Sequence, residues 1–301
     1  MVDQGDRVLS KKSEMLIVFA TKASVFVAFI LLIVKYYAWF ETGSIGVLAA
    51  LVDSLLDLGA SLINMFAVRY ALIPADDEHK FGHGKAEALA GLGQALFIVS
   101  SAVFLIIYTF ERIINPKQLE SFDIGLSIIV FSMALTFILV AYQRYVVKLT
   151  GSIAVKADSV HYSTDLISNA GILVGLGLAY LGWIYSDPII GLLIGVYILK
   201  SALEIGYESV QLLIDRELPE EEQQLIHKLA TKHSDVIEVH DVRTRQSGHT
   251  KFIQLHLVLD GGLTLLEAHV VSDEVERNIR KEFQYADILI HQDPHTESST
   301  H

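Results

Sequence analysis

Cysteine is absent from all 301 residues of the chain. Without thiols the protein can form no disulfide, no thiolate zinc site and no redox-active cysteine pair. Any metal ion that it binds must therefore be held by histidine, aspartate or glutamate side chains.

Charged residues are also scarce, at 19% of the chain against 52% hydrophobic residues. The mean hydropathy of +0.44 is too high for an ordinary soluble protein of this length and indicates an integral membrane protein with a soluble part. The net charge of −12 argues against nucleic acid as a partner, because phosphate binding would call for a basic face. An acidic protein suits cationic ligands instead.

Two motifs that would indicate other functions are missing from the sequence. No P-loop of the form GxxxxGK[ST] occurs, which argues against a nucleotide partner and against ATP as an energy source. The pattern HExxH is absent as well, which disfavours an intramembrane metalloenzyme.

Six apolar runs are long enough for membrane-spanning helices, which need about 20 residues each. They cover residues 15–40, 45–72, 86–114, 124–147, 153–181 and 184–213, so the membrane domain is expected over residues 15–213. Lysine and arginine gather in the polar tail of residues 1–14 and in the second and fourth connections. The positive-inside bias therefore places both termini in the cytoplasm.

The apolar pattern stops after residue 213, and residues 214–294 predict a compact soluble domain, followed by a tail of residues 295–301. The expected elements are a helix over 219–233, strands over 236–244 and 250–260, a helix over 265–282 and a strand over 287–292. The predicted fold class is thus an α-helical membrane protein with six transmembrane helices plus a small α+β domain. We expect that domain to be ferredoxin-like or metallochaperone-like, in the order α-β-β-α-β.

Two carboxylates, Asp53 and Asp57, lie four residues apart in the second apolar run. Residues i and i+4 project from the same face of a helix, so both side chains point the same way within hydrocarbon. Unpaired charges are costly in that environment. A divalent cation or protons would neutralise them.

A second pair, His161 and Asp165, has the same spacing in the fifth apolar run. If the two helices pack side by side, the four side chains converge into a tetrahedral site with one nitrogen and three oxygen ligands. That ligand set suits zinc and tolerates cadmium, iron(II) or cobalt. The alternative is that each pair only makes buried hydrogen bonds between helices.

The connection after the second apolar run carries a further candidate site. Asp76, His79 and His83 have the spacing of a loop-borne metal site, and the flanking glycines permit tight turns. A solvated polar loop that contains two histidines is the alternative.

Histidines concentrate in the predicted soluble domain. They lie on both hairpin strands, in the following helix and at the end of the last strand: His240, His256, His269 and His291, the last beside Asp293. These side chains could meet as a metal site at the domain edge, shared between two protomers. Scattered surface histidine is the alternative.

Five segments together resemble the cation diffusion facilitator family. They are DSLLD and HYSTD in two spans, PADDEHKFGHGKAE in a connection, and HDVRTRQSG and ILIHQDP in the soluble domain. The resemblance covers the chain except for the N-terminal dozen residues and the few after Pro294. It implies a homodimer in the lipid bilayer of a bacterial inner membrane that exports divalent cations in exchange for protons, with its cytoplasmic domains bridged by metal.

Carried over residue by residue, the resemblance implies three metal sites and one dimer contact. The transport site falls on Asp53, Asp57, His161 and Asp165, and the loop site on Asp76, His79 and His83. The cytoplasmic binuclear site falls on His240, His256, His269, His291 and Asp293, with Gln292 as a further candidate. A charge interlock between protomers falls on Lys85 and Asp215, and Val160 lies beside the expected ion path.

We therefore expect a secondary active transporter rather than an enzyme. It would export Zn²⁺, with Cd²⁺ and Fe²⁺ as further substrates, by proton antiport in metal detoxification and homeostasis. Histidine suits the exchange because an imidazole can give up a proton near neutral pH when a metal binds. A membrane metal sensor, which binds the ion without moving it, is the alternative, and metal flux separates the two.

Overall fold

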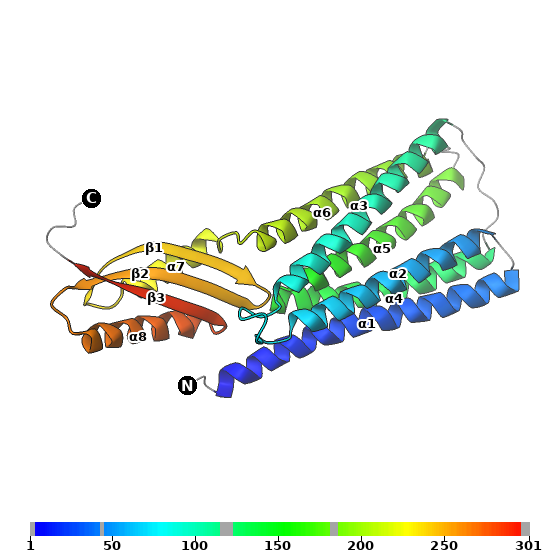
Figure 1. Cartoon of the computed structure of the whole chain (residues 1–301). Coiled ribbons are helices and arrows are strands. Elements are labelled where there is room, and N and C mark those ends of the chain that lie inside the picture. Colours follow the sequence, from blue (N-terminus) through cyan, green and yellow to red (C-terminus); the bar gives the residue numbers. More distant parts are fainter. Residues whose placement is uncertain (1–3, 43–44, 115–122, 181–185, 296–301) are drawn as a thin grey trace. The chain divides into compact units, whose positions relative to one another are not determined.

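The computed structural model describes residues 4–42, 45–114, 123–180 and 186–295 (Figure 1). The chain divides into two units, which we call the helical unit (Met1–Val210) and the C-terminal unit (Gln211–His301). Each unit is described by itself.

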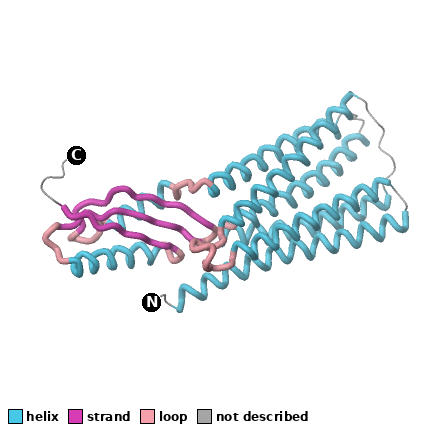
Figure 2. The backbone as a smooth tube through the Cα atoms, viewed as in Figure 1, coloured by secondary structure: helices cyan, strands magenta, loops and turns pink. Residues whose placement is uncertain are grey.

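Six long helices run through the described part of the helical unit, one for each predicted span (Figure 2). Their bounds are α1 (Gln4–Thr42), α2 (Ile45–Ala71), α3 (Lys85–Ile114), α4 (Asp123–Thr150), α5 (Ile153–Tyr180) and α6 (Ser186–Leu213). Because α1 begins at Gln4, the described part of the predicted polar tail is an extension of the first helix.

Four of these helices are apolar and long enough to cross a membrane within the residues that the structure describes. The qualifying stretches are Lys11–Glu41, Lys85–Glu111, Ile129–Thr150 and Ile189–Leu213. The other two helices, α2 and α5, carry the two predicted pairs of ionisable residues. The two helices that fall short of this criterion are therefore the two that carry the predicted transport-site residues.

The helices pack so that α2 and α5 are held within the bundle. α1 lies against α2 and α4, and α5 lies against α4, α3 and, over a shorter contact, α2. α6 packs against α3 through Ala102 and Ile198. Gly195 permits this close approach, since a Cβ there would lie 2.7 Å from Cγ1 of Ile106 on α3.

The C-terminal unit has the predicted element order α-β-β-α-β. Its elements are α7 (Glu220–Ala230), β1 (Val236–Ser247), β2 (Thr250–Asp260), α8 (Leu265–Glu282) and β3 (Ala286–His295). The sheet order is β1-β2-β3, with β1 antiparallel and β3 parallel to β2 (Figure 2). Helix α8 makes the crossover that a parallel pair of strands requires.

One face of this sheet forms the core with the two helices. The aliphatic row of β2 is buried, with Ile253 and Leu257 fully so, and it packs against Ile226 of α7 and Ile279 of α8. His256 alternates with that row and lies on the opposite, partly exposed face. The strand pattern thus leaves the open face free for polar chemistry.

Candidate metal centres

The centre of the helical unit brings three of the four predicted transport-site residues together. Nε2 of His161 on α5 lies 3.1 Å from Oδ1 of Asp57 on α2, and both side chains are buried. Together with Asp165, one turn along α5, they offer ligand atoms within 4.8 Å of one another. One imidazole nitrogen and two carboxylate oxygens form a donor set that suits a zinc-like ion.

Asp53 lies outside this group in the described residues. It sits one turn before Asp57 on α2, and its side chain is exposed, whereas α2 and α5 meet closely at Asp57. Lys35 of α1 acts electrostatically on Asp53 and donates to Oγ of Ser54 at 2.6 Å. The fourth ligand of the tetrahedral site remains a prediction.

Aromatic and polar neighbours hold the α5 residues in place. The Phe97 ring packs edge-on to the imidazole of His161, with 5.6 Å between ring centroids. Tyr162, fully buried, shares a hydrogen bond of 2.8 Å between its hydroxyl and Oγ of Ser61 on α2. Val160, predicted to lie beside the ion path, packs against the buried cluster of Ala95 and Ile205.

The sequence interpretation missed one buried acid in this region, Asp158 of α5. Its carboxylate accepts hydrogen bonds from Ser24 of α1 at 2.5 Å and from Gln143 of α4 at 2.7 Å. The sequence does carry a signal, because Asp158, His161 and Asp165 recur at i, i+3 and i+7 and thus share one helix face. The pairs at i and i+4 do not include it.

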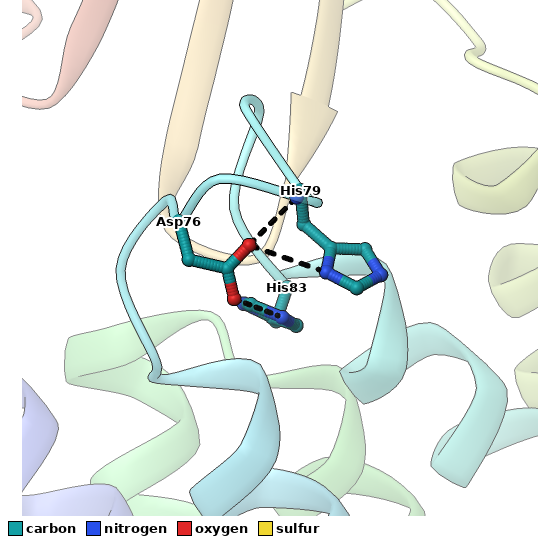
Figure 3. A group of neighbouring side chains, drawn as sticks. All are labelled: Asp76, His79 and His83. Atoms are coloured by element: carbon teal, nitrogen blue, oxygen red, sulfur yellow. Dashed lines mark hydrogen bonds and ion pairs between the residues drawn. The ribbon is translucent and has the colours of Figure 1, made fainter.

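The connection between α2 and α3 gathers all three predicted loop ligands (Figure 3). Oδ1 of Asp76 lies 3.4 Å from Nδ1 of His79, and Oδ2 lies 3.4 Å from Nε2 of His83. His83 is buried and its Nδ1 lies 3.3 Å from the carbonyl oxygen of Ile73. Gly82, at φ +77°, supplies the left-handed turn that brings His83 back toward Asp76.

The backbone prepares Asp76 for a cation. The backbone N–H of His79 donates to the carboxylate of Asp76 at 2.7 Å. This hydrogen bond is the main reason that the pKa of Asp76 is lowered. The N–H of Glu78 donates to the same oxygen at 2.9 Å. A carboxylate held ionised next to two imidazoles is a suitable donor set for a divalent metal.

A row of histidines crosses the open face of the C-terminal sheet. Residue pairing places His240 of β1 opposite His256 of β2, and His256 beside His291 of β3. Asp293 completes the group, because its Oδ2 lies 2.8 Å from Nδ1 of His256 and 3.4 Å from Nε2 of His240. His240, His256 and Asp293 offer ligand atoms within 4.8 Å of one another.

An irregularity in β1 makes this row. Between Arg243 and His240 the register with β2 shifts, and Asp241 within the shift has φ +46°. Its carboxylate lies 3.7 Å from Nε2 of His256, so Asp241 is a further acid at this site that the sequence interpretation did not include. The sequence did place Asp241 directly after His240, a predicted metal ligand.

Two other candidates lie outside the histidine row in this chain. His269 of α8 is exposed and its Nε2 lies 3.8 Å from Oδ2 of Asp273 on the same helix. Gln292 alternates with His291 and Asp293 and donates to Oγ of Ser272 on α8 at 2.8 Å. Its side chain is therefore engaged on the helix-covered face.

The two residues of the predicted charge interlock lie in different units. Asp215 belongs to the C-terminal unit, where its Oδ1 lies 3.3 Å from Nη1 of Arg245. Lys85 opens α3 in the helical unit. Their pairing across a dimer remains a prediction.

Comparison with known proteins identifies the family. The profile of the cation efflux transmembrane domain matches residues 21–214, and that of the cation efflux protein cytoplasmic domain matches residues 218–295. The chain belongs to the cation efflux family. The family resemblance and the fold class inferred from the sequence are thereby confirmed, and the two matches together take in the helical unit and the α+β unit.

Individual relatives agree with this membership. The cation-efflux pump FieF of Yersinia enterocolitica serotype O:8 / biotype 1B is 50% identical over 275 residues, which is 91% of this chain and 92% of that protein. FieF of Escherichia coli K12 / DH10B is 49% identical over the same shares. Since the cation efflux relatives are named pumps, the chain is a multi-pass membrane transporter rather than an enzyme.

Solved structures similar to this cation efflux protein match about a quarter of the chain. The Zn form of CzrB is 34% identical and covers 28% of this chain and 98% of that chain, with a TM-score of 0.27. The metal-bound C-terminal domain of the CzcD transporter from Thermotoga maritima is 23% identical and covers 26% and 94%, with a TM-score of 0.24.

Proposed function

We propose that this cation efflux protein exports Zn²⁺ from the cytoplasm in exchange for protons, and that it also carries Cd²⁺ and Fe²⁺. The observation that supports this most directly is the convergence of His161, Asp57 and Asp165 in the bundle. Nitrogen and oxygen ligands in a small site favour zinc-like ions over calcium or magnesium, which prefer six or more oxygens. Asp53 would complete the site when the ion binds.

The contact between His161 and Asp57 supports proton exchange. Nε2 of His161 lies 3.1 Å from Oδ1 of Asp57, a distance at which the two atoms can share a proton. A bound ion would take the same lone pairs and displace that proton. The two cations therefore compete for one position, which is the requirement for antiport through a single site.

We further propose that the protein works as a homodimer in a bacterial inner membrane, with both termini and the C-terminal unit in the cytoplasm. In that arrangement Lys85 and Asp215 form the charge interlock, and a second copy of the chain brings His269 to the histidine row. Metal at the row would offset the repulsion between two acidic units. The loop site of Asp76, His79 and His83 would deliver ions toward the bundle.

Flux measurements test the proposed function. Purified full chain in liposomes should move Zn²⁺ into the compartment that has the higher proton concentration. Protons should move in the opposite direction, as an enclosed pH dye would report. Asp165→Ala should lower the flux to that of protein-free liposomes, whereas Glu111→Gln, an exposed acid on α3, should not. Binding of Zn²⁺ without flux in the wild type would instead indicate a sensor, and full flux in Asp165→Ala would refute the site.

A further inference from the structure

Asp158 is the most thoroughly enclosed acid in the described helical unit. It is 1% exposed and lies one helical turn before His161 on α5. Its carboxylate contacts three other helices, through Ser24 of α1, Gln143 of α4 and, at 3.4 Å, Nε2 of Gln94 on α3. Each of these partners is neutral, so nothing in this set fixes the charge of the acid.

The hydroxyl of Ser24 can serve either charge state of Asp158. Its Oγ lies 2.5 Å from Oδ2 of Asp158 and 3.0 Å from the carbonyl oxygen of Ala20, yet it carries one hydrogen for these two acceptors. When Asp158 is ionised, Ser24 donates to it. When Asp158 is protonated, the acid donates to Ser24, and Ser24 donates to Ala20 instead.

The remaining contacts are compatible with both arrangements. Nε2 of Gln143 lies 2.9 Å from Oγ of Ser24 and 2.7 Å from Oδ2 of Asp158, so it can donate to whichever oxygen has a free lone pair. Gaining or losing a proton therefore requires rotation of a hydroxyl but no movement of a helix. Burial normally penalises the charged form of an acid. At Asp158 the same set of heavy atoms can form hydrogen bonds with both the ionised and the protonated carboxyl group.

The charged groups near Asp158 are those of the metal centre. In the described residues, His161 of α5 and Asp57 of α2 act on it electrostatically, and no lysine or arginine forms an ion pair with it. Arg144 of α4 donates to Ser163, and Glu87 of α3 accepts from Ser152. Tyr162 is the remaining titratable neighbour, and its hydroxyl is engaged by Ser61.

We propose that Asp158 is a proton-binding site of the transport cycle, separate from the metal ligands. A cation at Asp57, His161 and Asp165 favours the ionised form of an acid one turn away, because opposite charges attract strongly where water is excluded. On metal entry the O–H bond of the Asp158 carboxylic acid breaks, the carboxylate stays and the proton leaves to water. On metal release outside, the carboxylate takes up a proton from water. This inference rests on the proposed proton antiport.

Proton counting in liposomes tests the proposal. Wild-type full chain, Asp158→Asn and Glu111→Gln are compared for Zn²⁺ flux, for proton counterflow with an enclosed dye, and for Zn²⁺ affinity by calorimetry. Asparagine keeps the shape and can still accept from Ser24 but holds no exchangeable proton. We expect Asp158→Asn to bind Zn²⁺ within about threefold of wild type and to carry about one proton fewer per ion, with Glu111→Gln unchanged.

The outcomes separate this proposal from the proposed function. No proton counterflow in the wild type overturns the antiport and this inference with it. Counterflow in the wild type with an unchanged proton-to-zinc ratio in Asp158→Asn overturns the role of Asp158 alone.

A second variant tests the proposal if Asp158→Asn does not fold. Ser24→Ala keeps the acid but removes the hydroxyl that serves both states. We expect the pH at which Zn²⁺ flux is half-maximal to shift by about half a unit or more. Ser132→Ala, which removes a buried hydroxyl of α4 that has no hydrogen-bond partner, should leave that pH unchanged. An unshifted profile in Ser24→Ala overturns the proposal.

Discussion

The candidate metal site of the bundle, formed by Asp57, His161 and Asp165, and the histidine row of the C-terminal sheet use the same kinds of side chain in opposite surroundings. The side chains of His161 and Asp57 are 6% and 12% exposed, whereas those of His240 and His291 are 44% and 64% exposed. A buried group of charges is costly without a compensating cation, and the proposed exchange of Zn²⁺ for protons would keep this group compensated.

The exposed row is under no such constraint. Water solvates its imidazoles and carboxylates when no ion is bound, so it can load and unload metal without a counter-ion. Under the proposed antiport, we therefore assign the coupling to protons to the bundle, and a sensing or stabilising role to the sheet site.

The largest effect is expected from matched ligand removals in the two regions. Asp57→Ala should lower Zn²⁺ flux in liposomes by about 100-fold or more, because it removes one of the buried carboxylates that would hold the ion. His256→Ala should remove metal from the C-terminal unit, as measured by binding stoichiometry, yet leave measurable flux. Equal losses of flux in both variants would contradict the division of roles.

A smaller, selective effect is expected from changing the ligand type. His161→Asp converts the bundle site to oxygen ligands alone, which harder ions prefer, so the preference for Zn²⁺ over Mn²⁺ should fall by about tenfold. Competition binding on the full chain measures this ratio. His256→Asp is the matched control, and it should leave the selectivity of transport as it was.

The smallest effect concerns the water-exposed unit and its response to pH. Glu267 of α8 accepts hydrogen bonds from the backbone N–H of Thr264 at 2.8 Å and from the Thr264 hydroxyl at 2.7 Å. These bonds lower the pKa of Glu267 below its ordinary value of 4.5, and the backbone bond has the larger effect. Because the folded-state pKa is the lower one, the stabilisation is complete above the ordinary value and is lost as pH falls through the folded value.

Hydrogen exchange measures this loss at the start of α8. After correction for intrinsic rates, protection of the first-turn amides in the wild type should fall as the pH drops through the lowered pKa of Glu267. Glu267→Gln should already be less protected at neutral pH and should change less on acidification. Glu282→Gln, at the exposed end of the same helix, should behave like the wild type, and identical curves for all three would show that the cap contributes nothing.

Local patterns accounted for much of this structure. The lengths of the apolar runs predicted the six long helices, and the residue patterns after them predicted the element order of the C-terminal unit, because both depend on residues close in sequence. The pairs at i and i+4 lie on α2 and α5, and the structure brings Asp57, His161 and Asp165 of these pairs together. That Asp53 is exposed while Asp57 meets His161 depends on how two helices cross, and their sequences alone do not encode this.

The register of β1 at the histidine row could not be predicted from the sequence. Residue pairing between β1 and β2 runs from Ser247 with Thr250 to Arg243 with Gln254. If this register continued without a shift, His240 would lie opposite Leu257 and face the buried side of the sheet. The irregularity at Asp241 corrects this, and such bulges are hard to foresee from composition. Asp158 was missed for a related reason, since its partners come from three other helices, α1, α3 and α4.

The histidine row also has a consequence for folding. The sheet of the C-terminal unit has three strands, so β1 and β3 are its two edges, and the row runs from one edge to the other through His256. An ion bound by His240 and Asp293 would cross-link the first and last strands and close a loop that contains β2 and α8. Closing so long a loop removes much of the freedom of the unfolded chain, so the available metal concentration would set how readily this unit unfolds.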